Sequence, residues 1–74
     1  MPRKIRQLIA EAERNGMEFI PRRAKGSHRL YEHKASGTQI YISGHTRADA
    51  QPYQERDVRE ALEKIRRWKL ERGA

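Results

Sequence analysis

Apolar residues near the start of the chain recur with the spacing of one helix face. They stand at i, i+3, i+4 and i+7, at Ile5, Leu8, Ile9 and Ala12. Pro2 suits a first helical turn, where its missing N–H costs nothing, and Asn15-Gly16 is a typical helix stop. The pattern therefore predicts an amphipathic helix that ends at Asn15-Gly16.

The middle of the chain predicts three short strands separated by glycine turns. The expected strands are residues 17–22, 28–33 and 38–43, with turns at Lys25-Gly26-Ser27 and Ala35-Ser36-Gly37. Pro21 places the first strand near an edge or a strand end, because proline cannot donate a ladder hydrogen bond. Sequential strands joined by short turns indicate an antiparallel meander.

A polar connection and a second amphipathic helix complete the pattern. Residues 44–53 show no apolar periodicity, and long loops of this kind are often functional. We expect the helix to begin between Gln54 and Val58, with Asp57 and Glu60 at capping-box spacing. Its predicted buried stripe consists of Val58, Ala61, Leu62, Ile65 and Trp68.

The order helix, strand, strand, strand, helix predicts the fold class. Both helices need an apolar surface, and a three-stranded sheet has one face to offer. The expected architecture is an α+β two-layer sandwich with an antiparallel three-stranded sheet and an open, basic sheet face or edge. We see no repeat or linker, so residues 1–74 are expected to form a single domain.

Composition narrows the classes of function. Cysteine is absent, which excludes disulfides, thiol nucleophiles and thiolate metal sites and suits a reducing cytoplasm. The longest apolar runs have three residues, far short of the roughly 18 of a membrane span, and Pro2-Arg3-Lys4 is not expected to be a secretion signal. The net charge of +7 suggests a polyanionic partner.

The basic charge gathers between residues 21 and 34, which hold five basic residues and one acidic residue. Within this segment His28 follows the Gly26 turn, where glycine permits positive φ and close backbone approach. Imidazole exchanges protons near neutrality, and cations stabilise charge on phosphorus, so the cluster suits phosphodiester chemistry. The predicted phosphate-binding residues are Arg22, Arg23, Lys25, Ser27 and Arg29.

RNA cleavage by transesterification needs a base, a means of stabilising the pentacoordinate phosphorus and, ideally, an acid. His28 is the candidate base for a ribose 2′-hydroxyl, and Lys25, Arg29 and Arg23 are candidates for the second role. For the acid the residues leave three possibilities open, His45, His33 and Tyr31. The alternative is that His28 is a surface histidine of a hairpin with no catalytic role.

Other groups of residues give weaker evidence for a functional site. His28, His33 and His45, with Asp49 or Glu32, match no metal-site spacing, so we predict no metal and expect exposed strand histidines. Tyr31 and Tyr41 could stack on unpaired bases, but strand aromatics, Phe19 included, are more often core residues. Trp68 continues an apolar stripe, and its basic neighbours Arg66-Arg67 and Lys69 are typical of a solvated helix face.

With these residues in view, the chain resembles the HicA family of bacterial toxins. The likeness lies in three segments, Asn15-Gly16-Met17-Glu18-Phe19-Ile20, Lys25-Gly26-Ser27-His28 leading into Leu30-Tyr31-Glu32-His33, and Ile40-Tyr41-Ile42-Ser43-Gly44-His45. The resemblance implies a fold like that of double-stranded-RNA-binding domains. It also implies cleavage of messenger RNA without a cofactor, His28 as the single catalytic histidine, and neutralisation by a HicB-type antitoxin. Gly26, Tyr31 and His45 are then candidate accessory residues.

Two other classes of function remain open. The chain could be a non-catalytic RNA-binding module of the same fold, or a module whose basic face binds an acidic protein. His28 decides between the first alternative and catalysis, since a binding module would barely depend on one imidazole.

Overall fold

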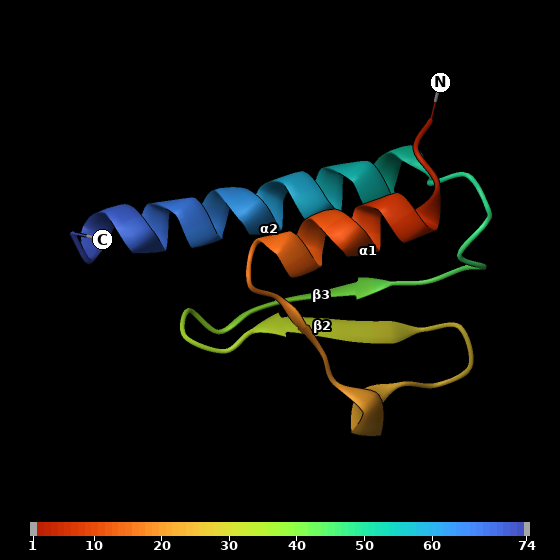
Figure 1. Cartoon of the computed structure of the whole chain (residues 1–74), viewed down its shortest axis with the longest axis horizontal. Coiled ribbons are helices and arrows are strands. Elements are labelled where there is room, and N and C mark those ends of the chain that lie inside the picture. The colour runs from red at the N-terminus through yellow and green to blue at the C-terminus, as the bar shows by residue number, and fades with distance from the viewer. Residues whose placement is uncertain (1, 74) are drawn as a thin grey trace.

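The computed structural model describes residues 2–73, which form two helices, three strands and one 3-10 turn (Figure 1). The predicted order of elements is confirmed. In chain order they are α1 (Ile5–Arg14), β1 (Glu18–Phe19), η1 (Pro21–Arg23), β2 (Arg29–His33), β3 (Thr38–Ile42) and α2 (Pro52–Glu71). No helix within residues 2–73 is long and apolar enough to cross a bilayer.

The strands form one antiparallel sheet in the order β1-β2-β3, and both helices lie on the same side of it (Figure 1). Tyr31 lies opposite Phe19 on one neighbour and Ile40 on the other, so these side chains share the face that the helices cover. The α+β two-layer sandwich resembling a double-stranded-RNA-binding domain is therefore confirmed.

The core lies between these two layers. Its buried residues come from one stripe of each helix, from the covered sheet face and from two connections, namely Ile5, Leu8, Ala12, Met17, Tyr31, Ile42, Ala50, Val58, Ala61 and Ile65. Burying a side chain the size of Leu or Ile contributes roughly 1.5–3 kcal/mol. Leu62 and Trp68, predicted for the stripe of α2, are only half-buried at its margin.

Helix α1 begins later than predicted. Its N-cap is Lys4, so Pro2 precedes the helix rather than occupying its first turn. The first N–H groups of a helix have no partner within it, and here those of Ile5 and Arg6 donate to the carbonyl oxygens of Ala48 (2.9 Å) and Thr46 (3.0 Å) in a distant segment. The connection between β3 and α2 thus caps α1.

The first strand is shorter than predicted. It ends at Phe19, the Ile20 N–H still donates to the Leu30 carbonyl oxygen of β2 at 2.9 Å, and the chain then turns through η1, with Pro21 at its start. Proline has no N–H for the ladder and its fixed φ suits a helical first position, which explains the change from strand to turn. The predicted strand 17–22 is wrong in its second half.

Helix α2 begins earlier than predicted. Pro52 occupies its first turn, and the Gln51 N–H donates to Gln54 Oε1 at 2.8 Å. The amide of Gln54 also donates to the Ser43 carbonyl oxygen at 2.8 Å, which anchors the helix to the end of β3. The predicted cap at Asp57 and Glu60 is wrong, because both residues lie inside the helix.

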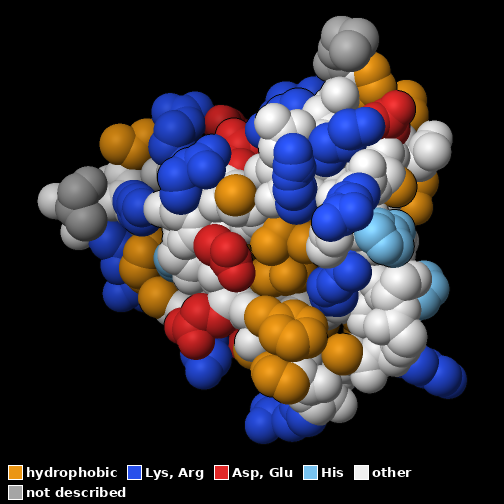
Figure 2. Space-filling model, turned by 45° about the vertical axis from the view of Figure 1, so that its right-hand side comes forward, with side chains coloured by type: hydrophobic (Ala, Val, Ile, Leu, Met, Phe, Trp, Pro, Cys, Tyr) orange, Lys and Arg blue, Asp and Glu red, His pale blue; other side chains and the backbone are white. Residues whose placement is uncertain are grey.

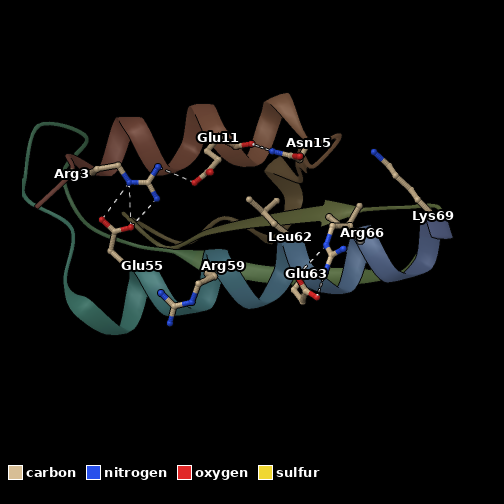
Figure 3. A pocket seen from close by; sticks show the side chains of 10 residues that line it. Arg3, Glu11, Asn15, Glu55, Arg59, Leu62, Glu63, Arg66 and Lys69 are labelled. Carbon is tan, nitrogen blue, oxygen red and sulfur yellow. Dashed lines mark hydrogen bonds and ion pairs between the residues drawn. The ribbon is translucent and has the colours of Figure 1, made fainter. Parts of the chain in front are cut away.

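Ion pairs hold the two helices together on their outer side. The Arg3 guanidinium lies between Glu55 (Nη2 to Oε1, 2.8 Å) and Glu11 (Nη1 to Oε1, 2.9 Å), as Figure 3 shows. Hydrogen bonding from Arg3 lowers the pKa of the Glu55 carboxyl. The hollow beside them also contains the Glu63–Arg66 pair, so much of its charge is already neutralised within the chain.

Candidate active site

His28 ends a tight turn that leads into β2. The N–H of Lys25 donates to the His28 carbonyl oxygen and the N–H of His28 donates back to that of Lys25, both at 3.0 Å. Gly26, with φ of +61°, and Ser27 are the two central residues, and Ser27 lacks positive φ. A glycine in the first central position is typical of a type II′ hairpin turn. The predicted turn and its need for Gly26 are confirmed.

The turn presents His28 and three cations to solvent. Arg22 and Arg23 on η1, and Lys25 beside the turn, are exposed, as are Ser27 and His28. Within residues 2–73 none of the three cations forms an ion pair. They are therefore available to an anion from outside.

Arg29 is placed differently from the other cations. It is half-buried at the start of β2, where its Nη1 donates weakly to the Ile42 carbonyl oxygen at 3.4 Å. The register puts Arg29 opposite Ile42, so His28 lies level with Ser43 at the end of β3. The turn before β2 and the segment after β3 consequently meet at one end of the sheet (Figure 1).

Of the two predicted locations for positive charge, a sheet face or a sheet edge, the open face is not basic. Alternation along β2 and β3 places Leu30, Glu32, Gln39 and Tyr41 on the face away from the helices. The exposed cations of the predicted site, Arg22, Arg23 and Lys25, lie instead on η1 and beside the turn. The positive charge of the predicted site therefore lies beside the sheet and not on its open face.

His28 also lines a groove between β3 and α2. The groove has a volume of about 470 Å³, and its walls are formed by Thr38, Gln39, Ile40, Tyr41 and Ser43 on one side and by Tyr53, Asp57, Glu60, Ala61 and Lys64 on the other. Figure 2 turns the end of the sheet that carries the turn before β2 toward the viewer and shows histidine and basic side chains on the surface there.

His45 lies two residues beyond Ser43, in the connection that leads to α2. Its side chain is exposed, and its Nδ1 accepts a hydrogen bond from the Arg47 N–H at 3.1 Å. This bond occupies Nδ1, and the other ring nitrogen, Nε2, has no hydrogen-bond partner within residues 2–73. His45 is thus an exposed imidazole at the same end of the sheet as His28.

Tyr31 and His33 lie in the interior. Tyr31 is 4% exposed, so it has no ring face on which a base could stack. His33 is 8% exposed, with its ring edge-on to Trp68 at a centroid distance of 5.3 Å and its Nδ1 bonded to Ser36 Oγ at 2.7 Å. The expectation of an exposed strand histidine is wrong for His33, because β2 alternation turns it toward α2.

The histidines do not converge. His33 packs beneath α2, whereas His28 and His45 are exposed at the opposite end of β2. Among residues 2–73 no three histidine, aspartate or glutamate side chains are grouped as metal ligands. The arrangement offers an imidazole and cations rather than a coordination sphere.

Comparison with known families adds an independent finding. The family described as "HicA toxin of bacterial toxin-antitoxin" matches residues 5–66. This range contains the sheet, the His28 turn and most of both helices. The chain belongs to the HicA toxin family. No match was found among curated proteins or among solved structures.

Membership of the HicA family makes this chain a toxin of a toxin–antitoxin system, a role that implies an antitoxin partner and an RNA substrate in general. The family match includes His28 and its flanking cations, and it ends at residue 66, before Trp68.

Sequence reasoning missed the second wall of the groove in this HicA-family chain. Tyr53 was assigned to a loop, and Asp57 and Glu60 to a helix cap. A usable signal was Pro52, since proline favours the first helical position and would have started α2 there. That start puts Tyr53, Asp57 and Glu60 on one face of the helix.

Proposed function

We propose that this HicA-family chain is a metal-independent endoribonuclease that cleaves messenger RNA in the cytoplasm, with His28 as its catalytic residue. A HicB-type antitoxin neutralises it in this proposal. The observation that carries the proposal is the His28 turn, an exposed imidazole at the end of a two-residue loop, beside the unpaired cations Arg22, Arg23 and Lys25.

The chemistry follows from these groups. His28 takes the proton of a ribose 2′-hydroxyl, whose oxygen attacks phosphorus and forms a 2′,3′-cyclic phosphate. The bond from phosphorus to the 5′-oxygen breaks, and that oxygen needs a proton. Lys25 and the η1 arginines stabilise the negative charge that builds up on the phosphoryl oxygens. Of the three candidate acids in the sequence, Tyr31 and His33 are buried, so the exposed His45 or a solvent water supplies this proton.

The same surface suits an antitoxin. Exposed cations that repel one another favour a partner with an acidic surface, which also steers association. A HicB-type antitoxin that covers the His28 turn would block substrate access to the imidazole and the cations together. A complex in which His28 stays open to RNA would contradict this mode of neutralisation.

The purified chain is expected to cleave RNA in the presence of excess EDTA, because the proposed step needs only an imidazole and fixed cations. The products should carry 2′,3′-cyclic phosphate and 5′-hydroxyl ends, which mass spectrometry identifies. An RNA with 2′-deoxy substitution should resist cleavage, since the attacking hydroxyl is missing. Cleavage that needs added Mg²⁺, or that also cuts the 2′-deoxy substrate, would overturn the proposal.

Replacing both Arg22 and Arg23 by alanine is expected to weaken RNA binding and flatten its salt dependence. Each lost phosphate contact lowers the slope of log K against log[salt] by roughly 0.7 for single-stranded RNA. Binding titrations at several salt concentrations measure the slope. The matched control is Arg67→Ala, an exposed arginine near the far end of α2, which should leave the slope unchanged. Equal slopes for both variants would remove η1 from the RNA-binding surface.

A further inference from the structure

The groove between β3 and α2 combines features that a phosphate-binding surface does not need. His28 lies on its wall, so an occupant would adjoin the proposed reacting phosphodiester. Its other charged lining residues are Asp57, Glu60 and Lys64, which gives a local excess of negative charge in a chain of net charge +7. Two carboxylates repel an RNA backbone, so they favour a different part of the nucleotide.

We infer that this groove is a base-recognition subsite that takes one unpaired guanine next to the cleaved bond, read by Asp57 and Glu60. The inference rests on the proposed RNA cleavage at His28. Carboxylates only accept hydrogen bonds, and guanine presents two neighbouring donors, N1–H and the 2-amino group, on its Watson–Crick edge. Adenine and cytosine offer one amino donor there beside an acceptor nitrogen, and uracil one N–H between two carbonyl groups.

The helix face supports this assignment. Tyr53, Asp57, Glu60 and Lys64 recur at i, i+4, i+7 and i+11, which brings all four onto one stripe of α2. The stripe one residue further along, Gln54, Val58, Ala61 and Ile65, is buried in the core. Packing of the core stripe therefore fixes the rotation of α2 and aims the polar stripe at the groove.

The two carboxylates have no cationic partner within residues 2–73. Five other acidic residues form ion pairs, namely Glu11, Glu18, Asp49, Glu55 and Glu63, whereas Asp57 and Glu60 form none. Lys64 lies four residues after Glu60, yet no ion pair joins them. The acceptors stay available to a ligand, and the Lys64 ammonium supplies a donor suited to the guanine O6.

An exposed aromatic ring provides the apolar part of the subsite. Tyr53 in the first turn of α2 is 49% exposed and lines the groove, whereas Tyr41 borders the groove from β3 with its side chain on the sheet face away from the helices. Stacking on an aromatic ring binds any base, whereas the carboxylates distinguish one base from another. In this arrangement the RNA backbone follows the cations of the turn while the base enters the groove.

The test uses a pool of RNAs with randomised sequence, cleaved by the purified full chain and sequenced at the cut ends. Wild type is expected to show guanine enriched at one position beside the cut. Asp57→Asn with Glu60→Gln should reduce this enrichment by about tenfold or more, as expected when a paired base contact is lost. The matched control is Glu71→Gln, an exposed glutamate at the end of α2, which should keep the wild-type preference.

A binding measurement separates this inference from the proposed function. The His28→Ala variant is titrated with two uridine-rich hexamers, one with a single guanine and one without. Tighter binding of the guanine hexamer, lost in the Asp57→Asn, Glu60→Gln background, supports the subsite even if wild type cleaves nothing. Cleavage and binding without a base preference, or a preference that survives both substitutions, would overturn it. So would an effect of the two substitutions on antitoxin affinity alone, which would make the groove a protein-binding surface.

Discussion

Replacing His28 by alanine is expected to lower the rate of RNA cleavage by about 10²–10⁴-fold, the usual loss when a general acid–base group is removed. The folded state should be unaffected, because the side chain is exposed and its ring makes no hydrogen bond within residues 2–73. Single-turnover kinetics measure the rate, and thermal unfolding checks the fold. In bacteria, induced wild type should arrest growth and fragment messenger RNA, whereas the variant should do neither.

His45→Ala is the comparison variant for this experiment, since it removes the other exposed histidine at the same end of the sheet. A large loss in His28→Ala with a smaller one in His45→Ala assigns the base to His28. A comparable loss in both would give His45 the leaving-group proton. If folded, soluble His28→Ala cleaves RNA and arrests growth like wild type, catalysis at His28 is wrong and a non-catalytic RNA-binding module replaces it.

Replacing Tyr31 by alanine is expected to destabilise the fold by about 3–5 kcal/mol, the usual cost of removing a buried aromatic ring. A chain of this size has a free energy of unfolding of roughly 4–11 kcal/mol, so the variant should lose a large part of its stability. Tyr31 packs between the sheet and both helices, with Phe19 beside it at a centroid distance of 5.7 Å. Urea unfolding measures the loss.

Tyr31→Phe is the matched control, because it keeps the ring and removes only the hydroxyl group. It should cost less than about 1.5 kcal/mol, as shape-conserving core substitutions usually do. A wild-type unfolding curve for Tyr31→Ala would show that the ring is not a core element, and would reopen its role in stacking on bases.

Wild type and Tyr31→Phe are also expected to differ in alkaline solution. Burial raises the pKa of the Tyr31 hydroxyl above its ordinary value of 10, so the unfolded chain ionises first. Stability from this group is fully present below pH 10 and is lost as pH rises toward the raised pKa. Wild type should therefore lose more stability than Tyr31→Phe above pH 10. Parallel profiles would contradict the burial of the hydroxyl.

Local chemistry explains which predictions from sequence are confirmed. Gly26 can adopt positive φ without steric cost, and Asn15-Gly16 ends α1 by the same freedom, at φ of +89° for Gly16. Such features depend on a few neighbouring residues. The predicted end of β1 and the predicted start of α2 are wrong, because Pro21 and Pro52 each begin a helical turn.

The same distinction between local sequence and tertiary packing applies to the functional site. The sequence placed His28 on a glycine turn among exposed cations, because that arrangement is contained in eight consecutive residues, 22–29. It could not show that the same imidazole lines a groove with Asp57 and Tyr53, which lie far along the chain on another element. Spacing on one helix is readable from sequence, whereas the rotation of that helix against a sheet is not.

The sequence by itself determined the order of the elements, the antiparallel meander, the His28 turn and the HicA-type motif, all of which depend on local hydrophobic spacing and turn chemistry. Only the tertiary structure decided that Tyr31 and His33 are buried, that the connection after β3 caps α1, and that α2 aims two unpaired carboxylates at the groove beside His28. The physical reason is that burial and charge pairing depend on strand register and on helix packing, which bring together residues from distant parts of the chain.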